Sequence, residues 1–363
     1  MYKRQCEREK LLKALTISSR LVSSRIGLPI LQNIYLEVKN KTLTVCSTNL
    51  DSSIQFDIEV KNEDKGSLTV PAKTMLDYLY NNNDELITLD SVDTNLKVES
   101  STHKASLKGI SAQDYPSLPD ATLSYKLPFS VNELEKAISY TAFAAATDET
   151  RPVLTGLLWK FKDKKLQIVA TDGFRLALYE TESPEDITED YIIPKKSIQE
   201  VQKIFEEKDV EIGFSPTQVV FKGDGANFTS RLIDGSFPNF EAIIPKTKNI
   251  EITTKSSDLQ KALRIACLFS RDSAYTTSLI LEGNNLEINA VSPQLGETSN
   301  KVVVDNPSNQ PFKISVNAQY LIDVLSVLGD EVCISFIDQK SPIVVTIPKK
   351  SYFTYLVMPL RTT

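Results

Sequence analysis

The sequence predicts an α+β protein made of three tandem copies of one strand-rich module. Three observations support this prediction: self-similarity at a nearly fixed spacing, helical runs at equivalent positions of each copy, and alternating apolar residues typical of strands between them. The chain has 363 residues. That is more than one hydrophobic core usually supports, so about two to three domains are expected.

A helical run opens each copy. LLKAL begins at Leu11, LEKAI at Leu134 and LQKAL at Leu259, which places the copies 123 and 125 residues apart. In the first run the expected buried side consists of Leu11, Ala14, Leu15, Ser18 and Leu21. The other, largely basic side carries Lys10, Lys13, Ile17 and Arg20.

A basic helix side usually means no more than a solvated surface. In the third copy, however, Lys261, Arg264 and Arg271 repeat the pattern, and acidic residues concentrate in other segments. The recurrence favours a segregated positive field, although the formal net charge of −6 by itself argues against a nucleic-acid-binding protein.

A strand pattern follows the first helical run of each copy. TLTVCSTN, KLQIVATD and NLEINAVS carry equivalent leucines at Leu43, Leu166 and Leu286, spaced 123 and 120 residues apart. Each unit therefore reads as a helix followed by alternating strands.

A third register precedes a second helical pattern in each copy. LTVPAK around Val70, YIIPKK around Ile193 and KISVNA around Val316 are each 123 residues apart. With polar or proline-bearing joints between the copies, we expect three modules at 1–122, 123–248 and 249–363.

Composition excludes several classes of protein. No run of about 18 apolar residues occurs and the charged amino terminus lacks a secretory pattern, so we expect a cytoplasmic protein without a membrane partner. The cysteines Cys6, Cys46, Cys267 and Cys333 show no CxxC spacing, which favours unpaired thiols over a disulfide framework or a zinc site.

The sequence shows no arrangement typical of catalysis. His103 is the one histidine and stands in a polar run, where an exposed strand or turn position is expected. No phosphate-binding glycine motif occurs. Asp172-Gly173 is better explained as a turn between two strands than as a catalytic carboxylate. We therefore expect no enzyme activity, no metal and no cofactor.

Short motifs follow one another along the chain in a specific order. They are Leu28-Pro29-Ile30-Leu31, Val70-Pro71-Ala72-Lys73, Asp114-Tyr115-Pro116, Ala170-Thr171-Asp172-Gly173, Arg175-Leu176-Ala177, Phe228-Thr229-Ser230, Asp234-Gly235, Phe237-Pro238 and Val357-Met358-Pro359-Leu360-Arg361. Each motif is weak alone. Together with the threefold repeat, they make the chain resemble the bacterial DNA sliding clamps, the β subunits of the DNA polymerase III holoenzyme, over essentially its whole length.

The resemblance implies three tandem DNA-clamp (processivity) domains, with helices lining the interior of a ring and antiparallel sheets outside. It implies a head-to-tail homodimer that encircles double-stranded DNA without sequence specificity. The positions that match DNA-proximal residues of the family are Arg25, Lys73, Arg151 and Lys196. Pro152 and Val153 stand where relatives carry aromatic residues, which weakens the assignment of Arg151.

A partner-peptide cleft between the second and third domains is also implied. Its partners would be the replicative DNA polymerase alpha subunit, the clamp-loader ATPase complex and other proteins with a clamp-binding motif. Phe174 stands where relatives carry histidine, so we expect a different pocket shape. The matching positions are Leu154, Thr171, Gly173, Phe174, Arg175, Leu176, Pro238, Ile243, Asn317, Tyr320, Leu356, Met358, Pro359, Leu360 and Arg361.

For the subunit interface, the resemblance points to Leu107 in the first domain and to Leu268 and Phe269 in the third, with ordinary core positions as the alternative. Near the third-domain side Glu297 is the one carboxylate of its segment, so we expect mild salt dependence of dimerisation. The segment Tyr2-Lys3-Arg4-Gln5-Cys6 makes a poor buried strand at the start of the chain.

Two other classes of protein remain open from the residues alone. One is a repeat-built scaffold or peptide-binding protein that does not encircle DNA, and a more distant one is a nucleotide-independent hydrolase. A monomeric native mass would favour the scaffold, and turnover of a substrate would favour the hydrolase.

Overall fold

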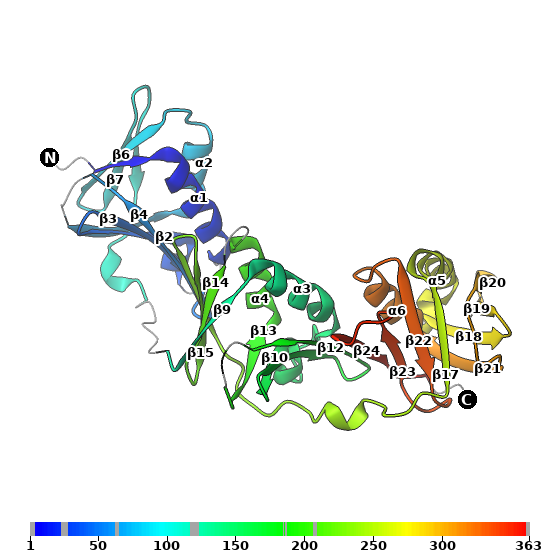
Figure 1. The fold of residues 1–363 in the computed structure, drawn as a ribbon. Helices are drawn as coiled ribbons and strands as arrows, with labels where there is room; N and C mark the ends of the chain where they lie inside the picture. The colour runs from blue at the N-terminus through cyan, green and yellow to red at the C-terminus, as the bar shows by residue number, and fades with distance from the viewer. Residues whose placement is uncertain are drawn as a thin grey trace. The chain divides into compact units, whose positions relative to one another are not determined.

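The computed structural model describes residues 4–22, 28–61, 65–116, 123–183, 185, 187–205 and 209–360 (Figure 1). The chain divides into two compact units. The first comprises Met1–Val131 with Ser197–Leu232, and the second Asn132–Lys196 with Ile233–Thr363. Within the described ranges, none of the helices has the length and apolar character needed to cross a bilayer.

One order of elements occurs three times along the chain: a strand, a helix, four strands, a second helix and three strands. The first copy runs β1 (Arg4–Glu7), α1 (Arg8–Ser18), β2 (Asn33–Lys39), β3 (Thr42–Thr48), β4 (Ser52–Glu59), β5 (Gly66–Pro71), α2 (Ala72–Tyr80), β6 (Leu86–Val92), β7 (Asn95–Glu99) and β8 (Lys104–Lys108). The second runs β9 (Tyr125–Phe129), α3 (Val131–Thr141), β10 (Gly156–Lys162), β11 (Lys165–Thr171), β12 (Arg175–Glu182), β13 (Asp190–Pro194), α4 (Lys195–Ile204), β14 (Val210–Phe214), β15 (Gln218–Gly223) and β16 (Ala226–Arg231). The third runs β17 (Ile250–Lys255), α5 (Ser256–Ser270), β18 (Thr276–Glu282), β19 (Asn285–Ser292), β20 (Gly296–Val303), β21 (Phe312–Asn317), α6 (Ala318–Leu325), β22 (Glu331–Phe336), β23 (Ile343–Thr346) and β24 (Phe353–Val357).

The first unit holds a four-stranded sheet of order β1-β6-β7-β8 and an eight-stranded sheet of order β5-β2-β3-β4-β16-β15-β14-β9. All of the strand pairs are antiparallel. In the larger sheet, β4 of the first copy pairs with β16 of the second, with Ser53 opposite Thr229. The sheet is therefore continuous across two copies of the repeat.

The second unit has the same plan. Its eight-stranded sheet has the order β13-β10-β11-β12-β24-β23-β22-β17, and its four-stranded sheet the order β20-β19-β18-β21. Here β12 of the second copy pairs with β24 of the third, with Leu176 opposite Leu356. The fourth strand of one copy thus pairs with the last strand of the next copy at both junctions.

The apolar periodicity of the sequence explains which faces are buried. In β2, Ile34, Leu36 and Val38 are buried, as the two-residue period of a strand requires. Lys10 and Lys13 in α1 and Arg20 in the 3-10 turn Ser19–Leu21 after it are exposed as predicted, but Ile17 was wrongly placed on that side and is buried. Ile17 follows the apolar stripe of Ala14 by one helical turn.

The first strand corrects another expectation. β1 pairs with β6 over Arg4–Glu7, and Cys6 is buried opposite Ile87. A four-residue strand needs just one inward apolar side chain, which Cys6 supplies, so the polar neighbours do not prevent pairing. Tyr2 and Lys3 of the predicted segment lie outside the described residues.

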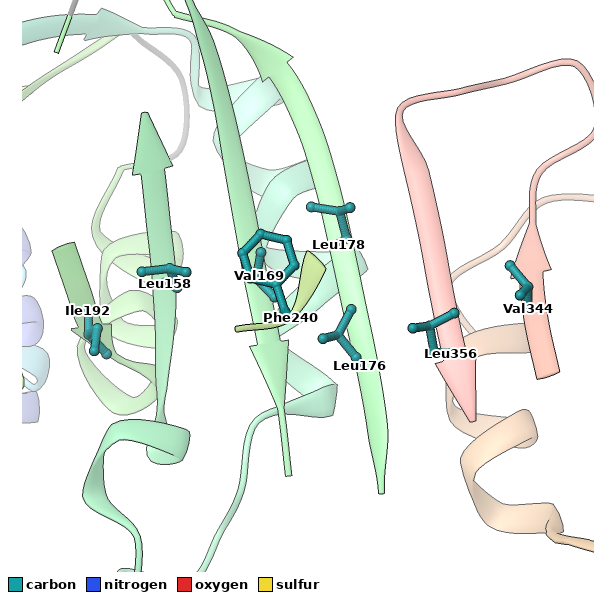
Figure 2. Packing of buried hydrophobic residues seen from close by; sticks show 8 residues of the cluster. All are labelled: Leu158, Val169, Leu176, Leu178, Ile192, Phe240, Val344 and Leu356. Carbon is teal, nitrogen blue, oxygen red and sulfur yellow. The ribbon is translucent and has the colours of Figure 1, made fainter. Parts of the chain in front are cut away.

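A hydrophobic cluster lies on one face of the large sheet in the second unit. Figure 2 shows its buried members, seven on strands of the sheet and Phe240 from the connection after β16: Leu158, Val169, Leu176, Leu178, Ile192, Val344, Leu356 and Phe240. Val153, Ile233, Phe237 and Ile244 pack against it while partly exposed. Because the chain after β16 contributes Phe237 and Phe240, this connection is fixed to the sheet by apolar burial.

Candidate functional site

A cavity of about 270 Å³ lies beside the start of β12 and the end of β24. Its lining contains many of the positions expected for a peptide cleft, and it lies entirely within the second unit. The lining residues are Arg151, Leu154, Thr171, Gly173, Phe174, Arg175, Leu176, Pro238, Asn239, Phe240, Ile243, Leu356 and Met358.

The turn between β11 and β12 forms one wall of this cavity. The Oγ1 of Thr171 accepts a hydrogen bond from Gly173 N (3.0 Å) and donates one to Arg175 O (2.5 Å). Asp172 Oδ1 accepts from the backbone nitrogens of Phe174 and Arg175. Gly173 has φ +93°, a conformation that side chains rarely adopt. These bonds hold the turn so that Phe174 projects with 59% of its surface exposed.

The floor of the cavity is apolar. Leu176 and Leu356 face each other across β12 and β24, and both are buried, as is Leu154. The rim carries Phe174, Ile243 and Met358, which are exposed. Such an apolar floor with an exposed apolar rim suits a short peptide that inserts aliphatic or aromatic side chains.

A charge network behind the turn fixes Arg175. Its Nε donates to Asp172 Oδ2 (2.9 Å), its Nη1 pairs with Asp323 Oδ2 and its Nη2 donates to Phe143 O (3.0 Å). The guanidinium also lies over the ring of Tyr320. Arg175 therefore links the turn to helix α6 through charge-assisted hydrogen bonds.

The electrostatics of this network keep Arg175 charged. Burial acts to lower the pKa of the guanidinium, but the acidic groups of Tyr355, Asp323 and Asp172 outweigh burial and raise that pKa above its ordinary value. Burial also raises the pKa of Tyr355, whose hydroxyl donates to Tyr320 O (2.9 Å). Both groups are locked in one protonation state near neutral pH.

Four of the predicted cleft positions do not line the cavity and have other roles in the second unit. Asn317 caps α6 by accepting a hydrogen bond from Gln319 N, and Tyr320 packs on Arg175. Leu360 N donates to Ser315 O (2.8 Å), which holds the segment containing Pro359 beside β21. Arg361 lies outside the described residues.

The structure reveals lining residues that the sequence reasoning missed. Asn239 and Phe240 follow Pro238 directly, so their place in the connection was a usable signal. Asp323 gave a second signal, because it stands one helical turn after Tyr320 on α6, where a carboxylate can reach the buried arginine.

Arg151, predicted to lie near DNA, also lines the cavity. Its Nη2 donates to Asp172 O (3.3 Å), and the guanidinium lies against Gly173, where a Cβ would be 3.1 Å from it. Pro152 and Val153 begin a short 3-10 turn, Pro152–Thr155, that turns Leu154 inward. The arginine is exposed, and its contacts are those of the cavity wall.

The other predicted DNA-proximal lysines are exposed on helices. Lys73 lies in the first turn of α2 in the first unit, and Lys196 lies in the first turn of α4 with its side chain 91% exposed. Lys196 Nζ is 3.6 Å from Glu149 Oε1. Arg25 lies outside the described residues.

The predicted interface residues occupy the two smaller sheets or their covering helix. Leu107 lies on β8 with 9% exposure, as an ordinary core residue of the first unit does. Leu268 on α5 is 67% exposed, and Phe269 beside it is partly buried. Near α5, Val291, Leu295 and Val303 add exposed apolar surface around β20.

The thiols and the histidine show no sign of a reactive or metal-binding site. Cys6, Cys46, Cys267 and Cys333 are all unpaired, and burial raises the pKa of each thiol. His103 is exposed in a turn before β8. Among the residues that the structure describes, no cluster of candidate ligands could hold a metal ion.

Three family models match the chain in succession: the N-terminal domain of the DNA polymerase III beta subunit at 2–119, the central domain at 129–239 and the C-terminal domain at 241–361. The chain belongs to the beta sliding clamp family. The beta sliding clamp of Bacillus subtilis is 28% identical over 98% of both chains, and that of Caulobacter vibrioides is 32% identical over 98% of both. The crystal structure of the DNA polymerase III subunit beta from Pseudomonas aeruginosa superimposes with a TM-score of 0.95 at 27% identity, covering 99% of this chain and 100% of that one.

Family membership confirms the predicted fold class, three clamp domains that combine helices with antiparallel sheets. Beta sliding clamps are processivity factors of DNA replication. The boundaries 1–122, 123–248 and 249–363, and the roles of individual site residues, stay predictions.

Proposed function

We propose that this beta sliding clamp acts as a head-to-tail homodimer that encircles duplex DNA and tethers the replicative polymerase to it. The observation that carries the proposal is the match of all three clamp domains along nearly the whole chain. A closed ring holds DNA by enclosure, so processivity needs no tight local contact with any base.

Strand pairing supports the proposed ring closure. At both junctions within the chain, the fourth strand of one copy pairs with the last strand of the next copy, as β4 with β16 and β12 with β24. Among the described strands, β20 is the fourth strand of the third copy and β8 the last strand of the first copy, and each ends its sheet without such a partner. The same rule then joins β20 of one subunit to β8 of another.

The apolar residues near these two edges fit the proposed contact. Leu268 on α5 and Val303 at the end of β20 expose large side chains, and Leu107 lies on β8. Backbone pairing of two strand edges would bring these side chains together. Glu297 is a lone carboxylate in its segment, so apolar burial would contribute more to this contact than charge pairs.

The 270 Å³ cavity is the proposed docking site for partner peptides. Its partners would be the replicative DNA polymerase alpha subunit, the clamp-loader ATPase complex and other proteins with a clamp-binding motif. Leu176, Leu356 and Leu154 would receive apolar side chains, and Met358 and Phe174 would close over them. The ten predicted lining positions in the cavity support this assignment.

Exposed lysines and arginines on helices would supply the attraction to DNA phosphates. Lys73 and Lys196 are exposed in first turns, and α1 exposes Lys10 and Lys13. Contacts of this kind give salt-sensitive and sequence-independent affinity. We infer that the chain itself is non-catalytic and needs no cofactor.

Retention on circular DNA tests the proposal most directly. The clamp is loaded by its cognate loader onto a nicked circular plasmid, separated from free protein, and the plasmid is then cut. Retention on the circle with release after cutting is the expected result. Equal retention on circular and linear DNA would favour an ordinary binder, and a monomeric native mass would favour the scaffold.

A further inference from the structure

A second cavity, of about 320 Å³, lies within the first unit beside the start of β4 and the end of β16. It occupies the place in the first unit that the peptide cavity occupies in the second, at the junction of two copies of the repeat. Its lining residues are Thr48, Leu50, Asp51, Ser52, Ser53, Pro116, Gln218, Thr229 and Arg231.

The turns that border the two cavities have the same backbone structure. Thr48 Oγ1 accepts from Leu50 N (3.1 Å), as Thr171 Oγ1 accepts from Gly173 N (3.0 Å). Leu50 has φ +77° where Gly173 has φ +93°. A left-handed leucine is uncommon and strained, and such strain occurs often at binding sites.

The contact that joins the two strands beside each turn is also the same. Arg231 N donates to Asp51 O (2.9 Å), as Met358 N donates to Phe174 O (2.8 Å). The exposed rim therefore carries an arginine and an aspartate in the second cavity, where the peptide cavity carries a methionine and a phenylalanine.

The floors differ in the same direction. Ser53 and Thr229 face each other across β4 and β16, at the register position that Leu176 and Leu356 hold in the peptide cavity. All four residues are buried. A floor of two hydroxyl groups cannot favour a leucine or phenylalanine side chain, because such a ligand would leave the hydroxyls without hydrogen bonds.

The wall behind the turn is uncharged in the first unit. Ser52, which matches Arg175, lies with its Oγ 3.2 Å from Ser197 Oγ, and Ser230 Oγ donates to Ser197 Oγ (2.7 Å). These three buried hydroxyls replace the arginine network. Arg231 is thus the one guanidinium among the described lining residues of this cavity.

We propose that this second cavity binds the carboxylate of an acidic side chain in an extended peptide segment. Arg231 would pair with the carboxylate, and the hydroxyls of Ser53 and Thr229 would donate hydrogen bonds to it. Asp51 at the rim would accept a backbone N–H of the same peptide. The Asp51 carboxylate repels a phosphate dianion more strongly than a singly charged carboxylate, and phosphate has no backbone N–H to donate to Asp51, so the lining favours a peptide over free phosphate.

The proposal goes beyond the proposed function, which needs only the apolar cavity. It predicts that the clamp offers two clefts with opposite preferences, one for apolar and one for acidic peptide side chains. The two clefts can be observed separately, since Leu50 lines the second cavity and Leu356 lines the peptide cavity.

Methyl NMR of the full-length clamp with labelled leucines tests the proposal. The probe is the blocked peptide acetyl-Gly-Glu-Gly-Gly-amide, its control is the glutamine counterpart, and inorganic phosphate forms a third arm. The Leu50 methyls should shift with the glutamate peptide at about millimolar concentration, with at least about tenfold weaker response to the glutamine peptide. The Leu356 methyls should stay unchanged.

Two variants complete the test. Arg231→Gln keeps the backbone hydrogen bond to Asp51 and should lower the affinity for the glutamate peptide about tenfold. Arg231→Lys should retain part of that affinity. Absence of a Leu50 shift up to about 10 mM peptide, equal response to both peptides, or stronger binding of phosphate would each overturn the proposal. Loss of DNA retention in the circular-plasmid assay would bear on the proposed function and leave this result unaffected.

Discussion

The guanidinium carbon of Arg175 lies 4.6 Å from the centre of the Tyr320 ring, while its nitrogens pair with the carboxylates of Asp172 and Asp323. This contact joins the turn before β12 to helix α6. It thereby connects a wall of the peptide cavity with the helix beside it, and it positions Phe174 through the turn.

Replacing Arg175 with leucine should destabilise the protein by about 3–5 kcal/mol, because Asp172 and Asp323 would stay partly buried without the guanidinium that pairs with them. Urea unfolding followed by circular dichroism measures this. Lys248→Ala, which removes an exposed pair with Glu251, is the control and should cost about 0–1 kcal/mol. Equal losses for the two variants would show that the network contributes little.

The rim of the peptide cavity should decide affinity for apolar partner peptides. Met358→Ala should lower the affinity for a leucine- or phenylalanine-bearing peptide about tenfold, because the methionine would close over the inserted side chain. Deletion of residues 358–363 should abolish binding and leave the dimer intact. Calorimetry measures both, and Leu50→Ala, equally exposed at 39%, is the matched control. Unchanged peptide affinity of Met358→Ala would show that Met358 does not contact the bound peptide.

An exposed apolar side chain on α5 should control dimerisation. Leu268→Asp should shift the clamp from dimer to folded monomer in sedimentation experiments, since a buried, unpaired carboxylate opposes association. Phe174→Asp changes a similarly exposed residue at the peptide cavity and should keep the dimer mass. Dimerisation should depend only mildly on salt. A dimeric Leu268→Asp protein would place the interface elsewhere.

The two lysines in helix first turns should contribute to DNA affinity through phosphate contacts. Lys73→Ala and Lys196→Ala should each reduce the slope of log affinity against log salt by about 1, without altering sequence preference. Fluorescence anisotropy with duplex DNA at several salt concentrations measures the slope. Lys126→Ala on β9 serves as a control. If Lys73→Ala or Lys196→Ala gives the same slope as this control, the lysine replaced in that variant does not contact DNA.

Thiol reactivity should follow burial. Burial, with a smaller contribution from Asp323, raises the pKa of Cys267 to about 11, and burial raises that of Cys6 to about 12. At pH 8 the partly exposed Cys267 should react slowly with a disulfide reagent. The rate should rise about tenfold for each pH unit, and this slow reaction phase should be absent from a Cys267→Ser variant. A fast reaction phase in the folded Cys267→Ser protein would contradict the burial of Cys6, Cys46 and Cys333.

The same shifts set the sign of the alkaline pH dependence. Because the folded-state pKa of Cys6 is raised, its contribution to stability is fully present below the unfolded pKa of about 8.5. That contribution is lost as pH rises toward about 12. The free energy of unfolding should therefore fall as pH rises above about 8.5. In a Cys6→Ala variant the slope of this fall should be smaller, because the variant lacks the thiol.

Local sequence was sufficient for the repeated elements and insufficient for the contacts between copies. Periodicity placed Leu11, Leu134 and Leu259 in the first helices and identified the turn at Asp172-Gly173. The pairing of β12 with β24 joins residues about 180 positions apart, and no local pattern encodes such a register.

Side-chain roles were harder to predict than elements. Arg151 was assigned to DNA from its position in the family pattern, and this role stays a prediction; its contact with Gly173 in the cavity wall was not predicted. Arg175 was expected in the cleft, but its pairing with Asp323 depends on tertiary geometry. Polar side chains reach partners that are distant in sequence, whereas apolar periodicity reports only which face is buried.

The open edges of β8 and β20 also bear on solubility. An isolated chain that presents two complementary edges can recruit further copies without end and grow into a filament. Proposed closure after two subunits uses both edges at once and terminates that growth. Variants that weaken closure without blocking the edges should therefore be prone to polymerise at high protein concentration.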